Sequence, residues 1–107
     1  MNKNDMSFGQ TVGEVTDTTY TNLSETVDIM NSPDYKVRLV AEYVQTNIRY
    51  QKLHNMLVKY DANKLDFEPT CPVELLRKQK TVMGSYLYTL ETRMEMEDVN
   101  RPVVQVS

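Results

Sequence analysis

The sequence predicts an all-α fold, a long antiparallel two-helix hairpin with a short N-terminal helix or arm packed on it. Apolar residues recur at helical spacing over residues 32–60 and again over residues 72–98. Each stretch begins at a proline, which is common at the start of helices. The expected organisation is therefore an N-terminal arm, residues 1–31, the hairpin, residues 32–100, and a C-terminal tail, residues 101–107.

The first long helix is expected to have Ser32 as its N-cap and Pro33 as its first residue, because the first turn leaves its N–H groups unpaired. One seam runs along the whole helix and consists of Tyr35, Leu39, Tyr43, Thr46, Tyr50, Leu53, Leu57 and Tyr60. A second stripe lies nearly opposite and consists of Val37, Ala41, Val44 and Ile48. A helix that is apolar on two sides must be covered on both. The second stripe therefore requires either the N-terminal segment or another subunit.

The second long helix is expected to begin at Cys71 as N-cap and Pro72 as first residue, with Glu74 as the capping-box carboxylate. Before it, Asn63 is the expected left-handed cap that ends the first helix. The seam of the second helix is Leu76, Met83, Leu87, Leu90 and Met94. A mid-helix glycine costs about 1 kcal/mol relative to alanine, so we expect Gly84 to serve the close approach of another helix.

The N-terminal segment is less regular. Phe8, Val12 and Val15 fit a short helical face or a few residues of strand, and Leu23, Val27 and Met30 predict a short amphipathic helix that ends in a turn. This segment is a candidate cover for the second stripe, and it fits a mobile arm equally well. At the other end, the residues VVQV predict a short strand if an edge is available, and a frayed tail otherwise.

Composition indicates one small domain with a net charge of −3, 40% hydrophobic residues and no apolar run long enough to span a bilayer. We expect a cytoplasmic protein, because the polar first residues do not resemble a secretory signal. The lone Cys71 cannot form an internal disulfide, and His54 has no second metal ligand near it. No cofactor, metal or catalytic group is expected, so the sequence does not predict an enzyme.

Charge placement predicts a basic zone at the closed end of the hairpin. Its candidate anion-binding residues are Arg49, Tyr50, Lys52, Arg77, Lys78 and Lys80. The open end carries the acids Glu91, Glu95, Glu97 and Asp98. Arginine and lysine bind phosphates and tyrosine rings stack on bases, so the zone suits a phosphate-bearing small molecule. The alternative is a solvated charged face with seam tyrosines. An acidic chain without a groove-reading motif disfavours nucleic-acid duplexes as partners.

The segments EYVQTNIRYQKLHNML and CPVELLRKQKTVMGSYLYTLETRMEME resemble small hypothetical proteins of tailed phages and prophages, related to a crAss-like phage family. The resemblance covers Tyr35 to Glu97, and its distinctive parts are the CPxELL helix start and the YLxxLExR run. It implies a helical hairpin encoded by a mobile element, with no catalytic residues to carry over. If the protein is phage-encoded, it would act in the cytoplasm of the host cell.

Three function classes follow. The first is a non-enzymatic interaction protein, acting in counter-defence through its helical faces on a host or phage protein. The second is an oligomeric sponge that sequesters a nucleotide immune signal, which rests on analogy of architecture. The third is a minor virion assembly component.

We also expect a homodimer or higher oligomer, because the apolar residues exceed what one interhelical contact can bury. The expected interface residues are Val37, Ala41, Val44, Ile48 and Gly84. The competing outcome is a monomeric three-helix bundle that the N-terminal segment closes.

Overall fold

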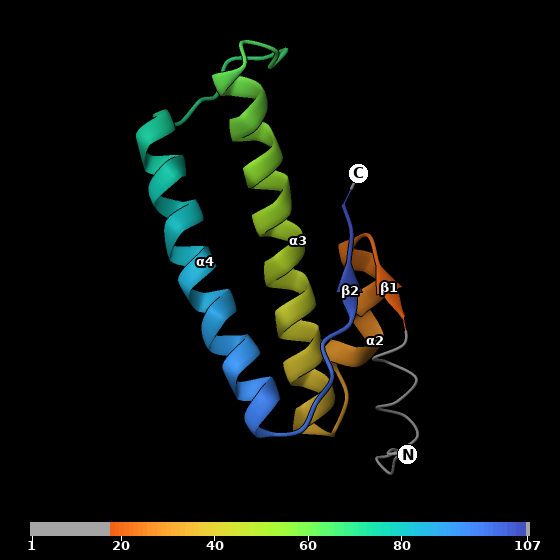
Figure 1. Ribbon diagram of the computed structural model, residues 1–107. Helices are drawn as coiled ribbons and strands as arrows, with labels where there is room; N and C mark the ends of the chain where they lie inside the picture. Colours follow the sequence, from red (N-terminus) through yellow and green to blue (C-terminus); the bar gives the residue numbers. More distant parts are fainter. Residues whose placement is uncertain (1–17, 107) are drawn as a thin grey trace.

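The computed structural model describes residues 18–106 and shows two long antiparallel helices with short N- and C-terminal elements along one of them (Figure 1). The elements in chain order are β1 (Thr19–Tyr20), the 3-10 helix η1 (Leu23–Thr26), α2 (Val27–Met30), α3 (Tyr35–Asp61), α4 (Val73–Met96) and β2 (Val103–Val104). The predicted helical hairpin with a short N-terminal helix is confirmed. The expectations for Phe8, Val12 and Val15 lie outside the described residues.

The start of α3 lies later than the proline signal predicted. Asp34 is the N-cap, and its carboxylate accepts the N–H of Lys36 at 2.9 Å. Ser32 Oγ instead accepts the N–H of Asp34 at 3.0 Å. The predicted cap at Ser32 was therefore wrong, because a second capping side chain two residues further on takes the first turn and leaves Pro33 in the preceding bend.

Both long helices end at a residue in the left-handed conformation. Asn63 has φ 60°, as predicted, and the N–H of Lys64 donates to the carbonyl of Lys59 at 2.8 Å. After α4, Asp98 has φ 57° and the N–H of Val99 donates to the carbonyl of Met94 at 2.8 Å. These bonds close the last turns in the Schellman pattern. The start of α4 at Val73 differs by one residue from the prediction, with Pro72 rather than Cys71 at the N-cap position.

The buried core lies in the open half of the hairpin, which we define as α3 up to Ile48 and α4 from Leu87 onward. Its members are Tyr20, Val37, Leu39, Val40, Tyr43, Val44, Ile48, Leu87, Leu90, Met94 and Val99. The predicted second stripe is at most 3% exposed. Leu23, Ile29, Val104 and Val106 pack against this cluster. The chain therefore covers that stripe itself, and those residues do not offer an exposed surface to a second subunit.

The N-terminal helical segment packs on α3 through a face that differs from the predicted one. Leu23 and Ile29 are half-buried and Thr26 is buried, whereas Val27 and Met30 are 47% and 44% exposed. The segment begins as a 3-10 helix, in which every third residue is aligned, so the spacing of 23, 26 and 29 replaces the expected α-helical spacing. Thr26 Oγ1 donates to the carbonyl of Leu23 and accepts the amide of Gln45, both at 2.8 Å.

The C-terminal residues form a strand because an edge is available. Thr19 pairs with Val103 and Tyr20 with Val104 in a parallel two-stranded sheet. Gln51 of α3 holds this strand, since its amide donates to the carbonyl of Val104 at 2.8 Å and accepts the N–H of Val106 at 3.1 Å. Chain segments far apart in the sequence thus close over the same side of α3 (Figure 1).

Candidate functional site

The closed half of the hairpin consists of α3 from Arg49 onward, the connection 62–72 and α4 up to Tyr86. The short N- and C-terminal elements lie beside α3 away from the connection, so this half is built mainly from two helices (Figure 1). Leu57 is 4% exposed, while Leu53, Leu76 and Met83 are only half-buried. Polar and apolar side chains of this half are consequently available to a ligand.

A hollow of about 360 Å³ lies between the last turns of α3 and the connection. It is lined by Lys52, Asn55, Met56 and Lys59 from α3, and by Lys64, Leu65, Asp66 and Phe67 from the connection. Its volume falls at the small end of the range for ligand pockets. We call it the lysine hollow, because three lysines and one aspartate give its lining a positive balance although the chain is at −3.

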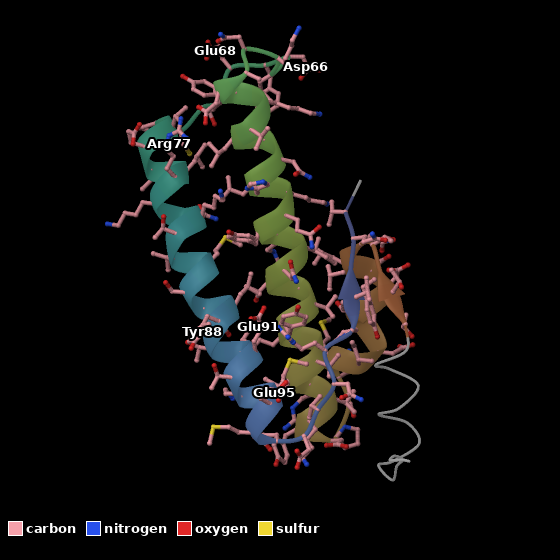
Figure 2. The ribbon with its side chains drawn as sticks, in the orientation of Figure 1. Asp66, Glu68, Arg77, Tyr88, Glu91 and Glu95 are labelled. Carbon is pink, nitrogen blue, oxygen red and sulfur yellow. The ribbon has the colours of Figure 1, made fainter. Side chains whose placement is uncertain are left out.

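The local fold explains how the lysines come together. Lys52 and Lys59 are two turns apart on α3 and therefore lie on the same side of the helix. The left-handed Asn63 reverses the chain, and the bond from Lys64 to the carbonyl of Lys59 fixes the first residue of the return. Asp66 lies in the connection at the tip of the hairpin (Figure 2). The hollow thus forms where the chain turns back at the end of α3. Its lysines produce a local positive potential.

The predicted basic zone is divided among several places. Lys52 lines the lysine hollow, whereas Arg49 and Lys78 are exposed and do not line it. Arg77, in the first turns of α4 (Figure 2), binds Asp61 through two hydrogen bonds of 2.6 and 3.1 Å, and Glu74 lies 3.6 Å from it. The guanidinium lowers the pKa of the Asp61 carboxyl, and its hydrogen bond with Asp61 raises the pKa of Arg77. Arg77 therefore joins the two helices at the closed end.

Tyr50 and Lys80, also in the predicted zone, contact each other beside Gly84. Lys80 Nζ lies 5.9 Å from the centroid of the Tyr50 ring, a cation–π contact. His54 stacks beside the same ring, with centroids 6.5 Å apart. A Cβ built on Gly84 would lie 3.5 Å from Cε1 of Tyr50, an ordinary van der Waals distance. The glycine therefore faces a ring of α3, but an alanine would also fit, so this packing does not require the close approach that was expected at Gly84.

Two of the four acids of the open end, Glu91 and Glu97, have side-chain partners within the described residues. Glu91 lies 3.2 Å from Arg101, and the Glu97 carboxylate accepts the hydroxyl of Tyr35 at 2.6 Å. This hydrogen bond raises the pKa of Tyr35. The side chain of Lys36 donates to the backbone carbonyl of Glu97 at 3.1 Å, which joins the start of α3 to the end of α4.

Sequence reasoning missed the contribution of the connection. Lys64, Leu65 and Phe67 were not among the predicted binding residues, although all three line the hollow and Phe67 is 55% exposed. Helical periodicity says nothing about a loop. The available signal was Asn63, whose left-handed conformation directs the following residues back along α3.

Among residues 18–106, no group of three or more histidine, cysteine, aspartate or glutamate side chains could hold a metal ion. The same residues include no helix with the length and apolar character to cross a membrane. Cys71 is a free, exposed thiol.

Fold and site together define a small helical-hairpin protein with a basic hollow at its closed end. The family model of Sequestin matches residues 33–96, which is more than half of the 107 residues. The chain therefore belongs to the Sequestin family. The match covers α3, the connection and α4, so the lysine hollow lies wholly within it, and it carries no statement about a phage origin. No curated protein and no solved structure matches the chain.

Proposed function

We propose that this protein is a non-enzymatic sequestering protein that binds a small phosphate-bearing molecule in the lysine hollow. The observation that carries this proposal is the convergence of three lysines on one ligand-sized hollow in an otherwise acidic chain. Lysine ammonium groups form charge-assisted hydrogen bonds with phosphate oxygens. The name Sequestin is compatible with an activity that withholds a ligand.

The remaining lining residues suit the rest of such a ligand. Phe67 and Leu65 offer apolar surface, and an aromatic ring is a stacking partner for a base. The amide of Asn55 supplies both a donor and an acceptor. Asp66 disfavours a second phosphate beside it and favours a sugar hydroxyl or a base N–H, because a carboxylate accepts hydrogen bonds. A nucleotide is therefore the ligand class that the lining fits best.

The other predicted functions remain open. An interaction protein that acts through its helical faces, including a role in counter-defence, stays a prediction. So does a phage or prophage origin, which sequestration of a nucleotide does not require. A virion component is the third alternative and has no specific residue in its favour.

A thermal-shift screen with mononucleotides, cyclic dinucleotides and ADP-ribose tests the proposed function. A ligand at a hundredfold its Kd adds about 2.7 kcal/mol to the free energy of unfolding. The variant carrying Lys59→Gln and Lys64→Gln should bind any such ligand at least about tenfold more weakly. Arg49→Gln removes a charge from the same helix outside the lining and serves as the matched control.

Three outcomes would contradict this function. The first is the absence of a shift with every phosphate-bearing compound. The second is equal affinity in the double-lysine variant and the wild type. The third is recovery of a chemically altered ligand after incubation, which chromatography would detect and which would indicate an enzyme.

A further inference from the structure

The connection supplies half of the lining of the lysine hollow but has one backbone attachment to α3 in that part. Residues 64–67 line the hollow from the connection. The N–H of Lys64 donates to the carbonyl of Lys59 at 2.8 Å, whereas residues 65–71 form no backbone–backbone hydrogen bond with any residue that the structure describes. Among the four lining residues of the connection, Leu65 alone is half-buried. Their place opposite the lysines of α3 therefore depends on how the chain leaves that helix.

Asn63 is the residue at which the chain leaves α3. It has φ 60°, in the left-handed region, and its own N–H donates to the carbonyl of Tyr60 at 3.1 Å. This region is unfavourable for residues other than glycine, although asparagine adopts it more readily than most. Asn63 itself does not line the hollow. A residue that cannot hold a positive φ at this position would direct Lys64 and the residues after it away from Lys59.

The packing of the hairpin does not account for this conformation. Asn63 is exposed and is not a member of the buried core, which lies in the open half. Two hydrogen bonds between Arg77 and Asp61 join α3 to α4 before the chain reaches Asn63. What the left-handed residue does determine is the place of the side chains that line the hollow from the connection.

We infer that Asn63 is a positioning residue of the lysine hollow and sets its affinity for a phosphate-bearing ligand without lining it. The inference rests on the proposed function, because it concerns binding in the same hollow. The left-handed conformation brings the side chains of Lys64 and Phe67 into the lining with Lys59. When this conformation is lost, the hollow loses one ammonium group for phosphate oxygens and one ring for stacking.

Substitution of Asn63 tests this inference, with the other left-handed helix end as the control. Asn63→Val places a β-branched residue at a positive φ, which is strongly disfavoured, whereas Asn63→Gly keeps the conformation. Asp98→Val is the matched control, because Asp98 has φ 57° and is followed by the same type of bond, also of 2.8 Å. Asp98 follows α4 at the opposite end of the hairpin from the hollow. Both valine variants should therefore unfold at a lower urea concentration than the wild type.

Isothermal titration calorimetry with AMP, on full-length variants that are folded by circular dichroism, measures the affinity. Asn63→Val should raise the Kd by at least about tenfold, whereas Asn63→Gly and Asp98→Val should stay within about twofold of the wild type. Asn63→Ala is less strained and should show a smaller rise. Hydrogen exchange of the Lys64 amide is the second measurement, and it should be faster in Asn63→Val than in the other variants.

The possible results separate this inference from the proposed function. An unchanged Kd in Asn63→Val, or an equal loss of affinity in Asp98→Val, would overturn the positioning role and leave the proposed function intact. A loss of affinity that Asn63→Gly shares would show that the asparagine side chain contacts the ligand, which also overturns the inference. If neither AMP nor another compound of the thermal-shift screen binds the wild type, the proposed function fails and this inference fails with it.

Discussion

Truncation of two seam leucines should have very different costs, although both belong to the predicted seams of the hairpin, Leu53 on α3 and Leu90 on α4. Leu90 is fully buried in the open half, where α3 and α4 are joined by the N- and C-terminal segments. Leu53 is half-buried in the closed half. Leu90→Ala should cost about 3–4 kcal/mol, in the middle of the range for buried leucines, because several elements enclose the site and it cannot collapse. Leu53→Ala should cost about 1–2 kcal/mol, because part of its surface is already hydrated.

The assay is equilibrium urea unfolding followed by far-UV circular dichroism. All variants should be compared at one protein concentration, because a dimer makes apparent stability depend on concentration. Domains of this size are stable by about 5–15 kcal/mol, so Leu90→Ala removes a large part of the total. Val58→Ala at an exposed position should stay within about 0.5 kcal/mol of the wild type. Equal losses at Leu90 and Leu53 would refute the concentration of the core in the open half.

Three further changes test local features. Gly84→Ala should raise the free energy of unfolding by up to about 1 kcal/mol, because alanine is the better helix former and its Cβ has room beside Tyr50; a loss in urea unfolding would show that the Tyr50 ring cannot adjust. Asp98→Gly should stabilise by about 0.5–1 kcal/mol, since glycine tolerates φ 57° and the change removes an acid from the helix C-terminus; an unchanged or lower Tm would contradict this. Glu25 accepts the N–H groups of Thr21 and Asn22 at 2.8 and 3.3 Å, and these bonds hold its pKa below the ordinary value of 4.5. The stabilisation that Glu25 gives to the folded state is therefore present above that pH and is lost as the pH falls through the lower folded-state pKa. Glu25→Gln removes the titrating group, so it should flatten the acid side of the curve of Tm against pH. A curve for the variant that runs parallel to that of the wild type would exclude this role.

The hairpin was predictable because long helices carry a repeated signal. The two seams are read over many turns, so errors at single residues do not alter the result. The boundaries were less predictable, since Ser32 and Asp34 are both good caps and only the tertiary position of the turn selects between them. The short strands could be foreseen only conditionally, because β2 depends on an edge that β1 supplies from the other end of the chain.

The candidate site was the least predictable part. Positive charges along two helices indicated a basic closed end, but whether they converge depends on rotation about each helix and on pairing with acids. Arg77 is engaged by Asp61 from the facing helix, which no spacing along α4 alone reveals. Lys64 reaches the hollow only because the chain reverses at Asn63.

The uneven distribution of the core has a consequence for binding. If a hollow lay in a well-packed core, any movement of its lining would break apolar contacts. The closed half holds few fully buried side chains, so movement of the hollow's lining breaks few such contacts. Lys59 and Lys64 can therefore adjust to a ligand without disturbing the cluster around Leu90. The Asp61–Arg77 pair keeps the two helices joined beside the hollow during such movement. The buried core and the proposed ligand-binding residues thus lie in different halves of the same two helices, so substitutions in the lysine hollow are expected to leave the core intact.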